Sequence, residues 1–479
     1  MGQYKYLLKN IGLLTLSSFG TKLLSFFLVP LYTNILSTTE YGTYDLFNTT
    51  IGILLPVLTL NVQESVLRFA LDKSLSRKSI VSIGTRYFII SNLLVIVGLV
   101  LNGIFEFSSM VKDYSLFFFL MFFTQALSGF VLAYIRGIDH IADLSISSAI
   151  SSIATILCNI LFLVVFRWGL IGYFLANILG PCIQCLYLMI RVKVFSDIDF
   201  RSDYSSENKE MTTYSKPIVV NSIAWWVNNA SDKYVVIFFC GLAENGIYSV
   251  ASKIPSILNI LQSIFSQAWT ISAVKDFDQE DKNGFFTNTY AAYNCLMTIM
   301  CSMIIIADRA LAKFLYAKDF YDAWKYVPWL TIAIVFGSLS GYIGGFFSAV
   351  KKSKIYAQST MLGAATNIIL NIIMTPILGA LGAAIATAIC YYVTWIFRYI
   401  HARKIIKLKI KLGRDITTYV LLVLQSILLL ALKESMELYA TEIVLFIIIV
   451  LLYSKDISKG IKKVFNSVKG KKSENHTLY

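Results

Sequence analysis

The stretch LSSFGTKLLSFFLVP, residues 16–30, lies within an apolar segment that runs from Ile11 to Leu36. A helix of about twenty residues is about 30 Å long, which is enough to cross the hydrocarbon core of a bilayer. Apolar windows of this length recur along all 479 residues, of which 57% are hydrophobic and only 15% are charged. A soluble protein of this length would show polar surface between such windows, so the composition predicts an all-α integral membrane protein.

The hydropathy pattern predicts about fourteen transmembrane helices. Their ranges are 11–36, 43–66, 80–103, 115–135, 143–166, 169–190, 217–240, 246–272, 286–307, 326–349, 355–377, 380–400, 416–432 and 440–454. With the N-terminus inside, and with Arg398 at the inner end of 380–400 counted as inner, the inner segments hold 31 of the 42 Lys and Arg residues, and the outer loops hold 7. The positive-inside rule therefore places both termini in the cytoplasm. The net charge of +14 then faces anionic inner-leaflet lipids, and no nucleic-acid partner is expected.

Two halves of the chain resemble each other. Residues 127–160 align without gaps on 339–372, at an offset of 212, and LSG stands at the start of both segments. Nearer the start of each half, EYGTY at 40–44 resembles ENGIY at 244–248. Such a repeat predicts two lobes of six helices with the same orientation, and parallel repeats place a substrate site between the lobes.

The expected domains follow from this repeat. They are an N-terminal six-helix lobe over 1–195, a cytoplasmic linker over 196–214, a C-terminal six-helix lobe over 215–402, two additional helices over 403–454 and a basic cytoplasmic tail over 455–479. The linker includes the longest polar interruption between the apolar spans. That interruption falls after the sixth span, where a connection between two halves is expected.

Enzyme and metal motifs are missing from the sequence. Cys182 and Cys185 form a C-x-x-C pair, but no second pair or nearby histidine completes a metal site, so both are expected to pack in the core. No P-loop and no Ser-His-Asp grouping is present. We therefore expect a transporter with no catalytic residue and no cofactor.

Besides Arg398 at the inner end of 380–400, four cations lie inside the predicted spans. A lysine at the middle of a bilayer costs about 2.5–3.5 kcal/mol, so it should face a water-filled cavity or a partner. A cavity lined by cations attracts an anion, because its low-dielectric walls focus the field. The predicted binding residues for an anionic headgroup are Lys22, Arg86, Lys233, Lys253, Asn228 and Ser25.

Structural ion pairs are the alternative explanation for these charges. Lys233 can pair with its neighbour Asp232, and Lys22 can pair with Asp45 or Glu64. Arg86 lies near the inner surface, where a long side chain can extend to water.

The acidic residues within the spans have a second candidate role. Asp232, Asp45 and Glu64 are candidates for binding a coupling ion, either Na⁺ or H⁺. Asp232 is favoured because Asn221 and Asn228 lie on the same helix face.

Three segments resemble a known family of transporters. They are TKLLSFFLVPLYTNILSTTEYGTYDLF at 21–47, SDKYVVIFFCGLAENGIYSVASKIPSIL at 231–258 and the Asn-rich eleventh span. They are similar to the polysaccharide transporters, which are the O-antigen and capsule repeat-unit flippases of the multidrug, oligosaccharidyl-lipid and polysaccharide exporter superfamily. The resemblance covers the whole chain.

The resemblance implies a V-shaped pair of lobes with a central cavity that opens alternately to each side. It implies a bacterial cytoplasmic (inner) membrane protein that moves an undecaprenyl-pyrophosphate-linked oligosaccharide outward, driven by an ion gradient. Cationic cavity residues are typical of these flippases, and Lys22, Lys233 and Lys253 lie where such residues are expected. A polysaccharide polymerase and a chain-length regulator are the expected protein partners, in lipopolysaccharide, capsule or exopolysaccharide synthesis.

Two other functions are the alternatives to a flippase. A cation-coupled multidrug exporter of the same superfamily would favour an acidic cavity, whereas the buried charge here is positive on balance. A membrane polysaccharide polymerase or ligase would need a large outer loop with catalytic groups. The longest outer loop, near 308–325, contains no histidine.

Overall fold

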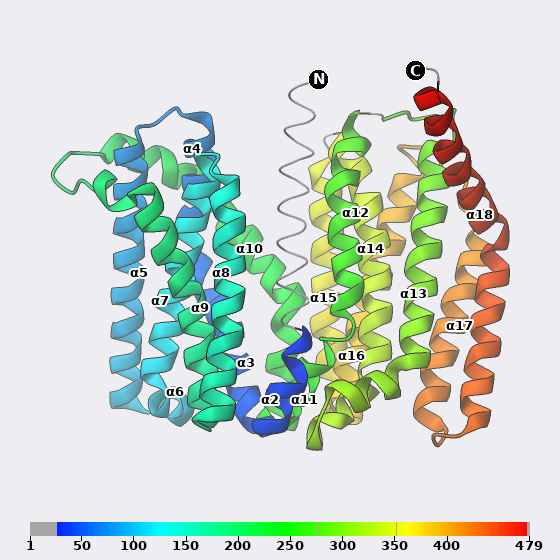
Figure 1. Ribbon diagram of the computed structural model, residues 1–479, viewed down its shortest axis with the longest axis horizontal. Helices are drawn as coiled ribbons and strands as arrows, with labels where there is room; N and C mark the ends of the chain where they lie inside the picture. The colour runs from blue at the N-terminus through cyan, green and yellow to red at the C-terminus, as the bar shows by residue number, and fades with distance from the viewer. Residues whose placement is uncertain (1–25, 276, 351, 477–479) are drawn as a thin grey trace. The chain divides into compact units, whose positions relative to one another are not determined.

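The computed structural model describes residues 26–275, 277–350 and 352–476, and within these ranges every regular element is a helix (Figure 1). This confirms the all-α class. Most of the expected first span, 11–36, lies outside the described residues, and Lys22 and Ser25 lie there with it. Their predicted roles therefore stay predictions.

The described residues form two compact units. The first runs to Ser249 and includes Leu315–Phe320, and the second contains Val250–Phe314 and the chain from Tyr321 onward. The helices up to the end of the first unit are α2 (Val29–Ile35), α3 (Thr38–Leu58), α4 (Val62–Asp72), α5 (Arg77–Phe105), α6 (Ser109–Asp113), α7 (Ser115–Gly137), α8 (Ile141–Asn159), η1 (Ile160–Val165), α9 (Gly169–Val192), η2 (Val194–Asp197), α10 (Ser205–Cys240) and α11 (Leu242–Ala251). Those that follow are α12 (Ser256–Lys275), α13 (Phe285–Leu315), η3 (Lys318–Lys325), α14 (Val327–Ala349), α15 (Ser353–Leu378), α16 (Ala380–Ala402), α17 (Leu412–Ala431) and α18 (Met436–His476).

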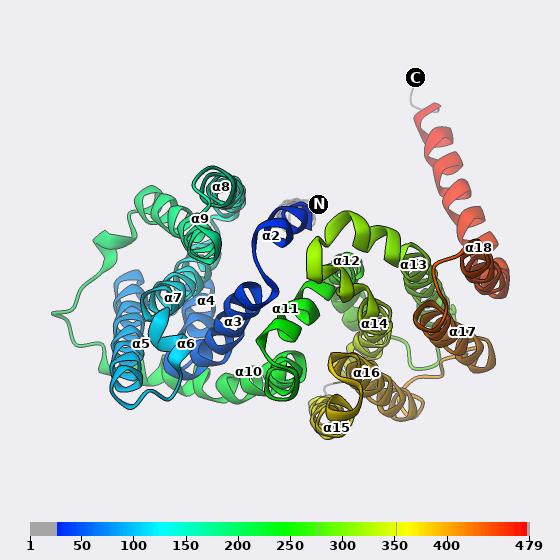
Figure 2. The ribbon, with the colours of Figure 1, turned by 90° about the horizontal axis from the view of Figure 1, so that it is seen from below.

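Each unit is built around one central helix. In the first unit α7 contacts α3, α4, α5 and α9, and Figure 2 shows these helices nearly end-on. Apolar side chains fill the contacts: Phe130 and Tyr134 belong to a cluster with α4 and α5, and Phe122 belongs to one with α3 and α9. In the second unit α14 contacts α12, α15, α16 and α17, and 72% of its apolar window is buried.

The helix boundaries recur in the way that the sequence repeat predicts. The two central helices, α7 and α14, each have 23 residues; α7 starts at Ser115 and α14 starts at Val327. The helices that follow them start at Ile141 and Ser353. Both pairs of starts are separated by the offset of 212 seen in the sequence, so corresponding segments form corresponding helices.

The described part of the chain has ten helices that are long and apolar enough to cross a membrane, or eleven if the bent pair α3 and α4 is one span. The count of fourteen is therefore not confirmed. The expected span 217–240 lies within α10, which begins with a polar turn and does not meet the same criterion. The expected span 246–272 is broken between α11 and α12, where Lys253 and Pro255 stand in a turn. A proline lacks the N–H that a continuous helix needs.

The bend between α3 and α4 is 58°. Leu60 and Asn61 both adopt left-handed backbone conformations there, with φ of 49° and 53°. Two such residues in succession cannot continue a right-handed helix, so the expected straight span 43–66 becomes two helices.

The units do not divide the chain where the sequence repeat divides it. The linker was expected at 196–214, but α10, which follows it, packs on α3 and α4, and so the first unit extends to Ser249. A compact unit is defined by contacts and a repeat by sequence, so the two boundaries need not coincide. The assignment of lobes to 1–195 and 215–402 stays a prediction.

The orientation of the chain in the membrane can be tested with reporter fusions. We expect fusions at Ser206, near the start of α10, and at Lys407, between α16 and α17, to report a cytoplasmic location. A fusion at Lys318, at the start of η3, should report an external one. The reason is the concentration of Lys and Arg in the inner segments. An external signal at Ser206 would contradict this topology.

Candidate functional site

The most extensive buried polar cluster that joins predicted site residues is centred on Asp45. This residue lies on α3, which begins with a capping box formed by Ser37 and Glu40, and only 7% of Asp45 is exposed. Lys233 of α10 donates from Nζ to Asp45 Oδ1 at 2.7 Å. Ser249 Oγ and Asn245 Nδ2 donate to Asp45 Oδ2 at 2.6 and 3.2 Å. Both oxygens of the carboxylate are therefore satisfied, one by a cation and the other by neutral donors.

Asp232 lies in the same cluster but has different partners. Its Oδ2 accepts a hydrogen bond of 2.6 Å from the hydroxyl of Tyr248, and its Oδ1 accepts one of 3.0 Å from the backbone N–H of Lys233. Only 8% of Asp232 is exposed. The ammonium of Lys233 thus pairs with Asp45, 188 residues away, and not with the adjacent Asp232 considered as its partner from the sequence.

The cluster exists because α3 and α11 approach each other closely. A Cβ added to Gly42 of α3 would collide with the backbone carbonyl of Leu242, and one added to Gly246 of α11 would collide with that of Thr38. Figure 2 shows α3 beside α11 and α10. The two glycines bring the backbones into contact, so that Asp45 reaches the side chains of α11.

The same two helices carry the repeated motifs. Gly42 is the third residue of EYGTY and Gly246 is the third residue of ENGIY. The next residue after each motif is Asp45 in the first copy and Ser249 in the second, and these two side chains are hydrogen-bonded. Asn245, Tyr248 and Ser249 are site residues that the sequence did not single out, and this correspondence is the signal that could have found them.

Two further hydrogen bonds hold α10 against α3. Trp226 Nε1 donates to the backbone carbonyl of Thr49 at 2.9 Å, and the hydroxyls of Tyr234 and Thr50 form a hydrogen bond of 2.6 Å. Lys233 immediately precedes Tyr234 on α10, and its ammonium is therefore held at a fixed place beside α3. The side chain of Lys233 is 22% exposed, so solvent still reaches it.

The other predicted site residues lie elsewhere. Arg86 of α5 donates to the backbone carbonyls of Phe200 and Ser202 at 3.5 Å, in the loop before α10. Glu64 is exposed on α4, beyond the bend. The structure therefore brings Asp45, Asp232 and Lys233 together, and it places Arg86 and Glu64 outside that cluster.

Two predicted residues are described only in part. Lys253 is half-buried in the turn between α11 and α12 and belongs to the second unit. Asn228 lies on α10, and its side chain is not among the described ones.

The sulfurs of Cys182 and Cys185 contact the hydroxyls of Thr124 and Ser128 at 3.2 and 3.3 Å, as expected for packed core cysteines. Within the described ranges there is no group of three His, Cys, Asp or Glu residues that could hold a metal ion.

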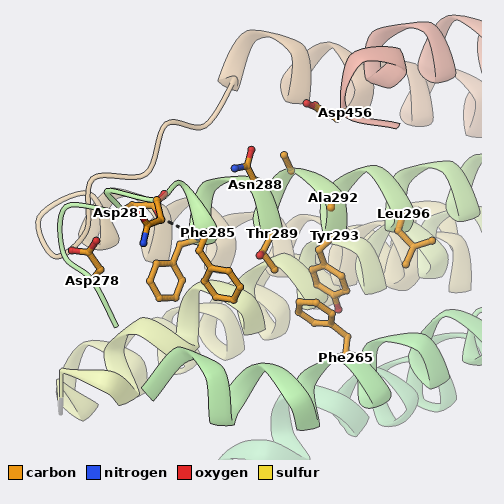
Figure 3. A pocket seen from close by; sticks show the side chains of 13 residues that line it. Phe265, Asp278, Asp281, Phe285, Asn288, Thr289, Ala292, Tyr293, Leu296 and Asp456 are labelled. Atoms are coloured by element: carbon orange, nitrogen blue, oxygen red, sulfur yellow. Dashed lines mark hydrogen bonds between the residues drawn. The ribbon is translucent and has the colours of Figure 1, made fainter. Parts of the chain in front are cut away.

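A cavity of about 850 Å³ lies in the second unit (Figure 3). Its walls include the stacked rings of Phe265 and Tyr293, whose centroids are 3.8 Å apart. Of its carboxylates, Asp281 accepts hydrogen bonds from the backbone N–H groups of Phe286 and Thr287 and so caps the start of α13. That carboxylate stabilises a helix end. None of the described residues that line this cavity is a Lys or Arg, whereas the Asp45 cluster contains the ammonium of Lys233.

The ten long apolar helices of the described residues are those of a multi-pass membrane protein. Residues 7–274 match the family described as "Polysaccharide biosynthesis protein". This range is more than half of the chain, so the chain belongs to that family.

A curated relative gives a second comparison. The protein of Haloferax volcanii named "Probable low-salt glycan biosynthesis flippase Agl15" is 21% identical over 206 residues, which are 42% of this chain and 43% of that protein. The match thus spans less than half the length of that relative.

Solved structures show the same fold. The lipid II flippase MurJ in an inward closed conformation aligns over 93% of this chain and 98% of its own, with a TM-score of 0.66 and 15% identity. An inward-facing multidrug resistance transporter of the MATE family and MOP superfamily aligns over 81% of this chain and 96% of its own, with a TM-score of 0.67 and 12% identity. The resemblance drawn from the sequence is therefore confirmed at the level of family and fold, and these relatives are named as flippases and transporters.

Proposed function

We propose that this protein is a flippase that moves a lipid-linked glycan across the membrane by alternating access. The observation that carries the proposal is the partly buried ion pair of Lys233 and Asp45, in a chain of the polysaccharide biosynthesis family. A glycan carried on a lipid pyrophosphate is anionic where sugar and lipid join, and such an anion needs a cation within the membrane. The relative Agl15, whose name describes a glycan biosynthesis flippase, supports the same class of substrate.

The arrangement around Lys233 allows an exchange of partners. In the structure the ammonium is neutralised by Asp45. A phosphate oxygen competes with Asp45 for the same ammonium, and Asp45 then remains in place through its hydrogen bonds to Ser249 and Asn245. A carboxylate that loses its ammonium partner in a buried site binds H⁺ or Na⁺ more readily. Binding of the anionic headgroup at Lys233 is in this way linked to binding of a coupling cation at Asp45 or Asp232.

The finer details belong to the proposal as well. The lipid is an undecaprenyl pyrophosphate in a bacterial inner membrane, the product enters an O-antigen, capsule or similar polysaccharide, and a polymerase and a chain-length regulator act with the flippase. A multidrug exporter is the second candidate, since the fold is shared with the MATE family. The partly buried ammonium of Lys233 favours the anionic substrate, because it would repel a cationic drug.

The test is transport by the purified protein in vesicles. We expect the wild-type protein to move a glycan-bearing polyprenyl pyrophosphate to the opposite leaflet, and an imposed H⁺ or Na⁺ gradient to accelerate the movement several-fold. Asp232→Asn should lose that response to the gradient while still moving the lipid slowly, because the amide keeps a hydrogen bond with Tyr248 but binds no cation.

Matched empty vesicles give the background rate. A wild-type rate equal to that background would overturn the proposed function. A normal gradient response in Asp232→Asn would remove Asp232 from the coupling step and leave Asp45 as the candidate.

A further inference from the structure

The first unit contains a second cavity that the Asp45 cluster does not explain. Its volume is about 330 Å³, and α3, α4, α7 and α9 contribute residues to its wall. None of the described residues that line it is charged. The polar groups that matter here are the hydroxyls of Tyr44 and Ser128 and the amides of Gln63, Gln125 and Asn177.

The three amides retain hydrogen-bonding capacity toward the cavity. Each uses one N–H on a protein acceptor: Gln63 on Asn61 at 3.2 Å, Gln125 on Asn48 at 3.1 Å and Asn177 on the carbonyl of Tyr173 at 2.9 Å. In the described part of the chain, no group donates to the side-chain oxygens of these three amides. An amide has two donor protons and an acceptor oxygen, so each keeps one donor and one acceptor for a ligand.

This chemistry suits one class of ligand. An anion would need a cation in the wall, and a purely apolar ligand would leave the amides of Gln63, Gln125 and Asn177 without partners. A neutral sugar ring offers several hydroxyls, each of which donates and accepts, and it has apolar C–H faces. Amides bind the hydroxyls, and the ring of Tyr44 with the side chains of Leu55 and Met121 provides surface for the faces. At about 30 Å³ per water molecule, the cavity has room for about ten waters, which is comparable with about one or two sugar rings.

The cavity also lies on the appropriate side of α3. Asp45 faces α10 and α11, where it meets Lys233, whereas the preceding residue, Tyr44, lines the cavity. Successive residues of a helix point about 100° apart, so the two sites occupy neighbouring faces of the same helix. The ionic site at Lys233 would bind the anionic junction of a lipid-linked glycan, and the neutral polar cavity would bind the sugar next to that junction.

We propose that this cavity binds an uncharged sugar residue of the transported glycan and thereby selects glycan-bearing lipid over bare lipid. The inference rests on the proposed function, and it adds a place and a chemical class for recognition of the sugar. A site of this kind predicts that the cavity affects the choice of substrate more than the transport step itself.

Two variants test the cavity by different means. Gln125→Leu removes the amide at nearly constant volume, and Gly129→Val fills the space, because a Cβ at Gly129 points at the end of the Gln63 side chain. Gly98→Val is the matched control, since Gly98 lies on α5 with nothing within 4 Å of an added Cβ. Each variant is purified as the full chain, checked for an unchanged melting temperature, and reconstituted in vesicles.

The probes are a polyprenyl pyrophosphate that carries one N-acetylhexosamine and the same lipid pyrophosphate without sugar. We expect the wild type and Gly98→Val to prefer the glycan-bearing lipid. Gln125→Leu and Gly129→Val should raise the KM for the glycan-bearing lipid about tenfold and leave transport of the bare lipid unchanged.

Three outcomes would overturn the inference. Equal losses for both lipids in the cavity variants indicate a structural effect, and unchanged preference indicates a cavity that holds only water. Either result leaves the flippase function standing. Transport of neither lipid by the wild type would instead overturn the proposed function, and this inference with it.

Discussion

Lys233→Ala should lower transport of a glycan-bearing lipid pyrophosphate at least tenfold. The substitution removes the cation that meets the anionic headgroup, and it leaves Asp45 buried without its ionic partner. Breaking one side of a fully buried ion pair costs about 3–5 kcal/mol of folding stability. The cost here should be smaller, because Lys233 is 22% exposed and Asp45 keeps its bonds from Ser249 and Asn245, but the melting temperature should still fall. Lys233→Arg should retain part of the transport, because arginine keeps the charge but holds phosphate with a different geometry. Transport in reconstituted vesicles and thermal unfolding measure the two effects.

A double variant separates function from stability. Asp45→Asn combined with Lys233→Gln leaves two neutral side chains that can hydrogen-bond to each other, and Ser249 can still donate to the amide oxygen. We expect the melting temperature to return to within a few degrees of the wild-type value while transport stays low. Recovery of transport in the double variant would mean that the pair is structural and that the headgroup binds elsewhere.

Gly42→Val should abolish transport and destabilise the first unit. The new side chain would collide with the carbonyl of Leu242, which belongs to the backbone and cannot rotate away. Forcing extra atoms into a packed contact costs about 1–3 kcal/mol. Separation of α3 from α11 also breaks the hydrogen bonds that Asp45 receives from Asn245 and Ser249, so the cost should lie at or above the top of that range.

Gly246→Val should have the same effect, because its Cβ would collide with the carbonyl of Thr38 on the other helix. Gly103→Val serves as the control: it changes a helical glycine of α5 with nothing within 4 Å of the new Cβ. Unfolding temperature and vesicle transport would be measured on all three. A stable, active Gly42→Val protein would show that the close approach of α3 and α11 is not required.

The sequence predicts the class of fold well because hydropathy and charge are properties of single segments. Ranges such as 115–135 and 326–349 nearly coincide with α7 and α14, which are apolar and unbroken. The prediction fails where helix geometry depends on the backbone. Hydropathy continues across Leu60 and Asn61, yet their left-handed conformations end α3, and it continues across Pro255, where the chain turns.

The candidate site shows a different limit. Asp45, Asp232 and Lys233 stand out in the sequence because ionisable residues are rare within apolar segments. The sequence does not show which of them pair. The carboxylate nearest to Lys233 along the chain is Asp232, but the one that binds its ammonium is Asp45, 188 residues away. Arg86 was grouped with the others by its depth in a span, although its contacts are with the loop before α10. Depth along a helix is readable from sequence, whereas the direction of a side chain depends on the partners of that helix.

The contact of Gly42 with α11 and of Gly246 with α3 is reciprocal: each copy of a repeated motif packs on the other at the same position. This is the pattern of an isologous dimer interface, in which one patch is its own partner. The residue after each motif breaks this symmetry, since it is an acid in one copy and an alcohol in the other, Asp45 and Ser249. Two identical acids would face and repel each other across a strictly symmetric contact, whereas here a single carboxylate meets a neutral donor.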